Sequence, residues 1–407
     1  LPGEMAVGHV RYSTTGDTVL RNVQPLFADF KFGGLAIAHN GNLTNAYAIR
    51  TSLVERGCIF QSTSDTEAFI HLIAISKGTN VVERVIDALR QVEGAYSLVA
   101  MTREKLIGVR DPMGVRPLVL GRIDDSYVLA SETCALDING AEFVRDVAPG
   151  ELIVIDKNGV NSFTPFVPQP TKFCIFEYIY FARPDSNVDG LNVYQVRKEI
   201  GAELARESGI EADVVVPVPD SGVPAAIGYA EESGIPFELG IIRNHYVGRT
   251  FIEPTQQIRN LGVKLKHNAN GQYLKDKRVV LIDDSIVRGT TSMKIVDMVR
   301  AAGAKEVHMR ISSPPITHSC FYGIDTPESS ELLASRMSVE EMGKAIGADT
   351  LSFISFDGLY RAVGHEGRNP DMPQYCDACF SGEYPIRLTD REAGPAPTQL
   401  SLLKTRG

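Results

Sequence analysis

The second half of the chain alternates short apolar runs with stretches of helical periodicity. Residues 279–282 are apolar and mostly β-branched, as is typical of a parallel strand that is covered on both faces. Residues 293–302 place their apolar side chains near helical spacing, with Ser292 or Thr291 as the expected N-cap and Gly303 just past the end. The pattern therefore predicts a strand, a polar loop and a helix in succession.

The same alternation continues on both sides of this segment. We expect a helix over 192–208 and strands over 213–216, 237–242 and 306–311. Strands that alternate with helices predict a parallel, doubly wound α/β sheet. In such a sheet the loops at the carboxyl ends of the strands converge on one crevice.

The first half of the chain is richer in strands. The runs that predict them are 6–12, 35–38, 96–101, 106–109, 117–120, 127–130 and 152–155. The proline-rich stretch 165–172 then breaks secondary structure. Because 407 residues can form two separate cores, we expect one domain over 1–165, a second over 166–392 and a mobile tail over 393–407.

Composition and charge exclude several classes of protein. The apolar fraction is near the globular average, and no apolar run approaches the roughly 20 residues of a membrane span. The net charge of −9 argues against a nucleic-acid surface. The first residues have no basic segment leading into an apolar one, so the cytoplasm is the expected location.

The loop after the strand at 279–282 has the chemistry of a phosphate site. Asp283 and Asp284 can bind ribose hydroxyls or share a hard cation such as Mg²⁺. Gly289 lets the backbone approach an oxyanion at the start of the next helix. The ligand inferred is a phosphorylated ribose, and the alternative is an ordinary turn with a solvated acidic pair.

This stretch resembles the phosphoribosyl-pyrophosphate (PRPP) motif of the type I phosphoribosyltransferases. The resemblance implies that Asp283 and Asp284 meet the ribose and the metal. It also implies that the following loop wraps the 5′-phosphate through Ser285, Ile286, Val287, Arg288, Gly289, Thr290 and Thr291. Ser221, in a second loop that resembles the same family, would join the two aspartates around Mg²⁺; its alternative role is a helix cap.

A polar stretch over 243–270 predicts a lid over the pyrophosphate leaving group. Arg249 and Lys264 would place positive charge on that group. The alternative is a disordered surface loop, which also suits the unliganded state.

Three motifs of the first half each have an ordinary structural explanation. Arg11 can grip a small carboxylate or form a surface salt bridge. Asn40 and Gly41 can supply two donors to an oxyanion or form a tight turn. Asp65 can bind a ligand or contribute to the N-terminal cap of a helix.

Together the three motifs resemble the glutaminase domain of the N-terminal-nucleophile amidotransferases, and residues 110–117 also look like this family. The resemblance implies an α+β, four-layer sandwich with two antiparallel sheets between helix layers. Arg11 and Asp65 would bind glutamine, and Asn40 and Gly41 would form the oxyanion hole.

The nucleophile of that family is an amino-terminal cysteine, whereas this sequence starts at Leu1. Cys58 and Cys134 are internal and suit small core positions. We therefore expect a first domain that lacks its initial strands and its nucleophile, and a chain that is at most ammonia-dependent.

Four further cysteines suggest a metal site. Cys376 and Cys379 form a close pair, and Cys174 and Cys320 are distant partners, a spacing that by itself favours tetrahedral zinc over a cluster. The segments 174–186 and 313–325 resemble the iron–sulfur branch of the glutamine PRPP amidotransferases. That resemblance implies a [4Fe-4S] cluster held by all four thiolates.

The family resemblance implies the first committed step of de novo purine synthesis. Ammonia from glutamine would attack PRPP, giving 5-phosphoribosylamine and pyrophosphate, with purine nucleotides as feedback inhibitors and a homotetramer as the assembly. One rival is a salvage-type phosphoribosyltransferase, which leaves Arg11, Asn40 and Asp65 unexplained. The other is a non-catalytic regulator that senses PRPP or nucleotides.

Overall fold

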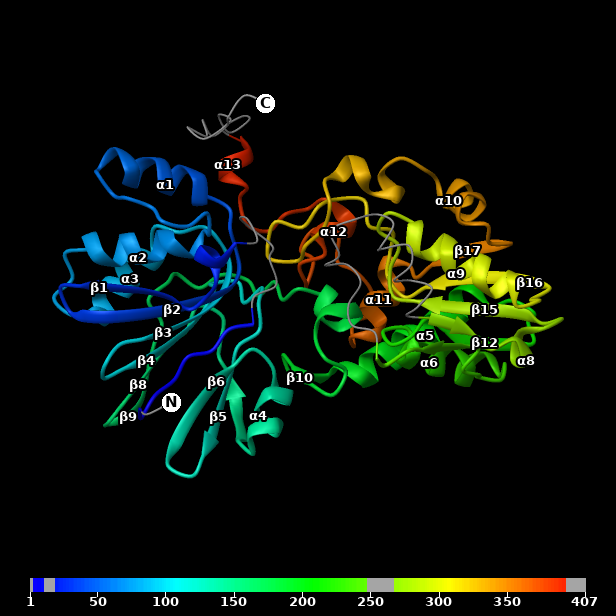
Figure 1. Ribbon diagram of the computed structural model, residues 1–407, viewed down its shortest axis with the longest axis horizontal. Helices are drawn as coiled ribbons and strands as arrows, with labels where there is room; N and C mark the ends of the chain where they lie inside the picture. The colour runs from blue at the N-terminus through cyan, green and yellow to red at the C-terminus, as the bar shows by residue number, and fades with distance from the viewer. Residues whose placement is uncertain (1–2, 11–18, 247–266, 393–407) are drawn as a thin grey trace. The chain divides into compact units, whose positions relative to one another are not determined.

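The computed structural model describes residues 3–10, 19–246 and 267–392 (Figure 1). Arg11, Arg249, Lys264 and the tail 393–407 lie outside these ranges. The chain divides into two compact units. The first unit comprises Leu1–Cys174, Cys320–Asp325 and Tyr384–Gly407, and the second comprises Ile175–Ser319 and Thr326–Glu383.

In the described part of the first unit, an antiparallel sheet has the strand order β1-β2-β3-β4-β8-β9. A second antiparallel sheet has the order β6-β5-β7. Their strands are β1 (Leu26–Phe30), β2 (Gly33–Leu43), β3 (Gly94–Met101), β4 (Leu106–Arg110), β5 (Val119–Ile123), β6 (Ser126–Ala130), β7 (Glu142–Asp146), β8 (Leu152–Asp156) and β9 (Gly159–Phe163).

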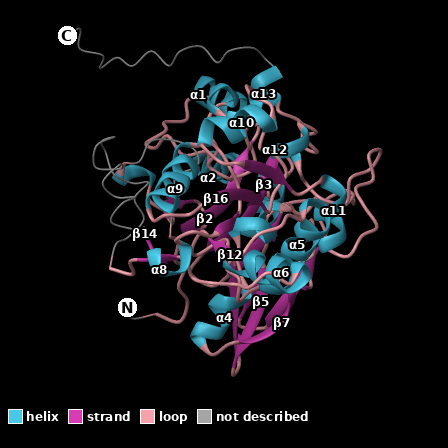
Figure 2. Cartoon of the chain, turned by 90° about the vertical axis from the view of Figure 1, so that its right-hand side faces the viewer, coloured by secondary structure: helices cyan, strands magenta, loops and turns pink. Residues whose placement is uncertain are grey.

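The two sheets are the inner layers of a four-layer sandwich. Helices α1 (Ala46–Glu55), α2 (Thr66–Ile75) and α3 (Val81–Leu89) lie on one side of the larger sheet (Figure 1) and bury apolar side chains against it. A second cluster, which includes Leu120 and Ile153, fills the space between the sheets. Helix α4 (Thr133–Asn139) covers the smaller sheet near β5 and β7 (Figure 2). These layers confirm the predicted glutaminase-type fold.

The described part of the second unit is built on a parallel sheet of order β12-β15-β16-β17. These strands are β12 (Val214–Pro217), β15 (Arg278–Asp283), β16 (Glu306–Ile311) and β17 (Thr350–Phe353). The principal helices of this unit are α5 (Val193–Ser208), α6 (Val223–Ser233), α9 (Thr290–Ala301), α10 (Val339–Ile346) and α11 (Phe356–Ala362). Alternate strand residues pack with α9 and α10 in one core. The predicted parallel α/β sheet is confirmed.

Short elements complete the described structure. They are η1 (Leu20–Asn22), η2 (Glu177–Phe181), β10 (Asn187–Val188), β11 (Leu191–Asn192), β13 (Ile241–Arg243), β14 (His267–Ala269), α8 (Gly271–Leu274), η4 (Ser329–Glu331), η5 (Leu333–Ser335), α12 (Ala378–Ser381) and α13 (Thr389–Glu392). None of the described helices is both long enough and apolar enough to cross a membrane.

Several predicted elements need correction. Helix α9 starts at Thr290 with Gly289 as its N-cap, because the left-handed Gly289 (φ 78°) turns the loop into the helix earlier than Thr291 or Ser292 would. Residues 6–10 are not in a strand, and Val10 is exposed. The strand predicted over 237–242 is reduced to a bridge at Phe237 and the short β13, which pairs with β14 outside the main sheet.

The loop that leads into α2 depends on one carboxylate. Glu67 accepts hydrogen bonds from the backbone N–H groups of Gln61 and Ser62 (2.8 and 2.7 Å) and from the Ser62 hydroxyl (2.6 Å). Burial opposes ionisation, but bonds from His71, Ser62 and the backbone lower the pKa of Glu67 to about 2. The ionised carboxylate therefore fixes the segment before Asp65.

We expect Glu67→Gln to lower the free energy of unfolding by roughly 1–2 kcal/mol at neutral pH. Since the folded pKa lies below the ordinary 4.5, this stabilisation is complete above pH 4.5 and is lost as the pH falls toward about 2. Thermal unfolding at several pH values measures it, with the exposed Glu104→Gln as the control. A variant as stable as the wild type at neutral pH would contradict the role of this carboxylate.

Candidate active sites

Two adjacent carboxylates lie at the carboxyl end of β15. Asp283 is the last residue of the strand, and both Asp283 and Asp284 are more than nine-tenths buried. The Asp283 side chain accepts the backbone N–H of Asp284 (2.9 Å), and its carbonyl accepts the N–H of Ser312 (2.9 Å), which follows the neighbouring strand β16. The pair is therefore held by the ends of two parallel strands.

Burial makes this pair costly when both groups are ionised. It raises the pKa of Asp283 well above the usual range, and the neighbouring charge of Asp284 raises it further. Burial also raises the pKa of Asp284, although hydrogen bonds from Ser221 and Ser285 and the charge of Arg197 oppose that shift. Ser285 donates to Asp284 Oδ1 at 2.5 Å. A bound cation would favour the ionised form of both carboxylates.

Ser221 belongs to this cluster. Helix α6 has Gly222 as its N-cap, so the alternative role of Ser221 as the cap residue is wrong. Instead its side chain hydrogen-bonds to Asp284. The backbone N–H of Val218 donates to the carbonyl of Ile282 (2.8 Å), which ties the loop after β12 to the end of β15.

The loop from Ser285 to Thr291 has one buried residue, Ile286, and several exposed or half-buried ones. Ile286 is buried in the core of the sheet, and the carbonyl of Val287 accepts the N–H of Leu333 (2.8 Å). The exposed Arg288 pairs with Glu331 at 2.9 Å. Gly289 has φ 78°, and a Cβ there would lie 2.6 Å from the side chain of Leu333, so only glycine suits this position.

The first turn of α9 forms the end of this loop. It reads Thr290, Thr291, Ser292, Met293, and the first two positions are exposed or half-buried. The backbone N–H groups at a helix start favour an anion, and hydroxyl side chains add donors without negative charge. The arrangement suits a phosphate next to the two carboxylates.

In the first unit, Asn40 and Gly41 lie within β2 and not in a turn. They pair with Ser97 and Tyr96 of β3, so the tight-turn alternative is wrong. Gly41 has φ 135°, and a Cβ would lie 2.1 Å from the carbonyl oxygen of Ala95. The backbone here requires glycine, and Asn40 is half-buried.

Asp65 lies beside this part of β2. Its carboxylate accepts the backbone N–H of Leu43 (3.0 Å) and faces Nδ1 of His39 at 3.8 Å. Burial raises the pKa of Asp65, but the charge and hydrogen bond of His39 and the backbone donors outweigh it, so that the pKa is lowered. Asp65 occupies the N-cap position of α2, and its carboxylate also anchors β2 through the N–H of Leu43.

Sequence reasoning assigned no role to Arg116, although this residue also contacts the site. Its Nη2 lies 3.4 Å from Oδ1 of Asn40, and Arg116 is almost fully buried. The segment 320–325 lies against the same strand, because a Cβ on Gly323 would approach Cα of Gly41 to 2.8 Å. Both contacts join residues far apart in the sequence, which no local pattern signals.

The cysteine-bearing segments are linked through their backbones. Ile175, next to Cys174, donates its N–H to the carbonyl of Cys376 (3.1 Å). The N–H groups of Thr317 and His318, which closely precede Cys320, donate to the carbonyl of Cys379. Across the described residues, no group of three or more His, Cys, Asp and Glu residues is placed to hold a metal ion.

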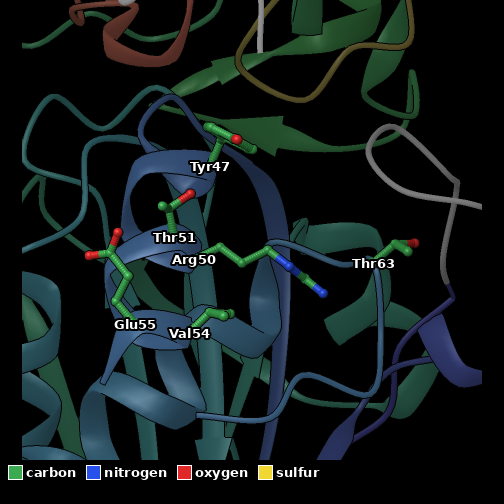
Figure 3. A pocket seen from close by; sticks show the side chains of 6 residues that line it. All are labelled: Tyr47, Arg50, Thr51, Val54, Glu55 and Thr63. Atoms are coloured by element: carbon green, nitrogen blue, oxygen red, sulfur yellow. The ribbon is translucent and has the colours of Figure 1, made fainter. Parts of the chain in front are cut away.

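A surface hollow of about 320 Å³ opens beside α1 (Figure 3). It is lined by Tyr47, Arg50, Thr51, Val54, Glu55 and Thr63. Figure 3 shows Arg50 extending from α1 toward the side of the hollow that carries Thr63. The predicted glutamine-site residues Asn40, Gly41 and Asp65 are not part of this lining.

Comparison with known proteins gives two domain families. Residues 9–137 match the glutamine amidotransferase domain, and residues 188–312 match the phosphoribosyl transferase domain.

The chain is 59% identical to an amidophosphoribosyltransferase of Rhizobium etli over 413 aligned residues, covering 100% of this chain and 83% of that protein. It is 51% identical to the amidophosphoribosyltransferase of Bacillus subtilis over 387 residues, covering 95% and 81%. Among solved structures, glutamine PRPP amidotransferase from B. subtilis complexed with ADP and GMP superposes with a TM-score of 0.87 at 51% identity, covering 93% of this chain and 83% of that one. The chain therefore belongs to the amidophosphoribosyltransferase family of purine biosynthesis.

Proposed function

We propose that the loops at the ends of β12 and β15 bind PRPP with Mg²⁺ and present C1 of its ribose to ammonia. The observation that carries this proposal is the buried pair Asp283 and Asp284 at the carboxyl end of a parallel strand. Two carboxylates and the hydroxyl of Ser221 are oxygen donors of the kind that Mg²⁺ prefers. Mg²⁺, when bound, would neutralise charge on the pyrophosphate leaving group.

The reaction then requires positioning more than a protein nucleophile. The nitrogen of ammonia forms a bond to C1, the bond from C1 to the pyrophosphate oxygen breaks, and the new ammonium group loses a proton. The loop from Ser285 to Thr291 would hold the 5′-phosphate through backbone N–H groups and the hydroxyls of Thr290 and Thr291. Arg249 and Lys264 are proposed to meet the pyrophosphate.

In the first unit we propose a glutamine site with Asn40 and Gly41 as the oxyanion hole. The Asn40 carboxamide and the Gly41 N–H would stabilise the charge that develops on the amide oxygen of glutamine. Asp65, whose pKa is lowered, is suited to bind the α-amino group. Arg11 is proposed to bind the α-carboxylate.

We propose further that Cys174, Cys320, Cys376 and Cys379 hold a [4Fe-4S] cluster. Four thiolates form a complete ligand set for such a cluster. The backbone bonds of Ile175 to Cys376 and of Thr317 and His318 to Cys379 support the proposal, because they tie together the segments that carry the cysteines. The cluster would have a structural role, and no step of the reaction is assigned to it.

Regulation by purine nucleotides is proposed by similarity. The B. subtilis relative is described as a complex with ADP and GMP, and it shares 51% of its residues with this chain over most of its length. We propose that purine nucleotides bind and inhibit this protein as well, and that it assembles as a homotetramer.

The transferase site can be tested without glutamine. With ammonia as the nitrogen source, we expect Asp283→Asn to lower PRPP-dependent pyrophosphate release by about 100-fold or more, because it removes one charge that binds Mg²⁺. Asp297→Asn, an exposed change on α9, is the matched control and should retain full activity. An Asp283→Asn protein with normal turnover would overturn the metal assignment.

The same variant should also be more stable without ligands. The raised pKa means that the folded state holds the proton of Asp283 more tightly than the unfolded state, so stability is lost as the pH rises from the ordinary 3.8 through the raised folded value. Asn removes this loss, and we expect a melting temperature higher by roughly 2–4 °C near pH 7. A lower melting temperature would contradict this explanation.

The glutamine site can be tested separately in protein that carries the amino-terminal cysteine of the family. We expect Asn40→Ala to lower the glutamine-dependent rate by about 10²–10³-fold, as for loss of one oxyanion donor, while the ammonia-dependent rate is preserved. Asn161→Ala, at an exposed position of β9, serves as the control. Equal loss of both rates would argue against the oxyanion hole.

Cluster binding can be tested by iron analysis and visible absorption of anaerobically purified protein. We expect about four iron atoms for each chain, and loss of the visible absorption in Cys376→Ser. Cys134→Ser, which changes a buried cysteine outside this set, should keep both. A colourless protein that contains one zinc ion would reject the cluster.

A further inference from the structure

Arg116 is a buried cation placed directly behind the proposed oxyanion hole. Its Nη2 lies 3.4 Å from Oδ1 of Asn40, and only about 1% of its surface is exposed. A guanidinium is costly to bury, and the oxygen of the Asn40 side chain is one of the groups that face it.

The turn that carries Arg116 is fixed by a buried carboxylate. Asp111, which is fully buried, accepts backbone N–H groups of Met113 (3.0 Å), Val115 (3.1 Å) and Arg116 (3.3 Å). The same carboxylate accepts the N–H of Tyr96 (3.3 Å), the residue that pairs with Gly41. The turn and the strand beside the site are thus held by one group.

The other side of Arg116 is held as well. Its carbonyl accepts Nε of Arg110 (2.9 Å), and the carbonyl of the following Pro117 accepts the hydroxyl of Ser97 (2.8 Å). Ser97 is the residue of β3 that pairs with Asn40. The Cα of Arg116 is therefore fixed relative to Asn40 on both sides.

This geometry decides which way the Asn40 carboxamide faces. A guanidinium can only donate hydrogen bonds, whereas a carboxamide has an oxygen that accepts and an NH₂ group that donates. The oxygen must face Arg116, so the NH₂ group is directed away from it. An oxyanion hole needs the NH₂ group, because a carboxamide that is rotated by half a turn would present its oxygen to the developing negative charge.

We propose that Arg116 is a positioning residue that holds the Asn40 carboxamide with its NH₂ group available to the oxyanion. The inference rests on the proposed role of Asn40. Arg116 acts through Asn40 and is assigned no contact with glutamine. Its contribution therefore depends on the presence of that side chain.

A double-mutant cycle in protein that carries the amino-terminal cysteine of the family tests the proposal. Glutamine-dependent and ammonia-dependent rates are measured for Arg116→Met, Arg116→Lys, Asn40→Ala and the double variants. We expect Arg116→Met to lower kcat with glutamine by about 10–100-fold with little change in KM, and Arg116→Lys to retain more of the rate. In the Asn40→Ala background, the change at Arg116 should lower kcat with glutamine by less than about twofold further.

Structural damage has a different signature. Arg84 is a comparably buried arginine of the first unit that donates to the carbonyls of Ile73, Ala74 and Gly78, so Arg84→Lys is the matched control. We expect it to lower the melting temperature and to leave kcat with glutamine within about twofold. Arg116→Lys should keep the ammonia-dependent rate, which shows that the transferase unit is folded, and an unchanged KM for glutamine shows that the first unit is folded as well.

The outcomes separate the two hypotheses. If Asn40→Ala lowers the glutamine-dependent rate but the losses at Arg116 and Asn40 multiply independently, Arg116 is only structural and this inference is overturned. If Asn40→Ala has no specific effect on the glutamine-dependent rate, the proposed oxyanion hole itself fails. A double variant no worse than Asn40→Ala alone supports the positioning role.

Discussion

The free-energy cost of burying two adjacent carboxylates is the main constraint on the proposed site of the transferase unit. Asp283 and Asp284 are each more than nine-tenths buried, and burial raises the pKa of both. A fold that only needed stability would replace such a pair by neutral residues, because like charges in a low-dielectric site repel each other. The unfavourable pair lies where the loops after β12, β15 and β16 converge. That convergence is also where a phosphorylated ribose and a cation would supply the missing positive charge and contacts.

The first unit uses buried charge for a different purpose. Asp111 is also fully buried, but it is surrounded by backbone N–H groups and acts as a structural acceptor for a tight turn. Burial still raises its pKa, and the neighbouring Arg110 and the backbone donors oppose the shift. The two units therefore differ in their buried aspartates: Asp111 organises its own turn, whereas Asp283 and Asp284 are proposed to bind a ligand.

Much of the fold and part of each site followed from local pattern. The strand at 279–282, the helix that ends at Ser208 and the strand at 306–311 have strong periodicity, and the structure contains all three. The start of α9 was misplaced because hydroxyl residues after Gly289 look like caps, whereas the positive φ of the glycine decides where the helix begins. Asn40 and Gly41 look like a hairpin turn locally, yet pairing with β3 keeps them in a strand.

The sequence by itself determined the alternation that predicts the parallel sheet and the chemical character of the loop at 283–291, because these depend on periodicity and on residues close together in the chain. The four-layer sandwich of the first unit was predicted from the family resemblance. Only the tertiary structure decided that Ser221 reaches Asp284, that Asp65 accepts the N–H of Leu43 in β2, and that Arg116 lies behind Asn40. Each of these contacts joins segments that are separated along the chain. Their energies depend on burial and on the direction of single hydrogen bonds, which are fixed only when the sheets and helices pack.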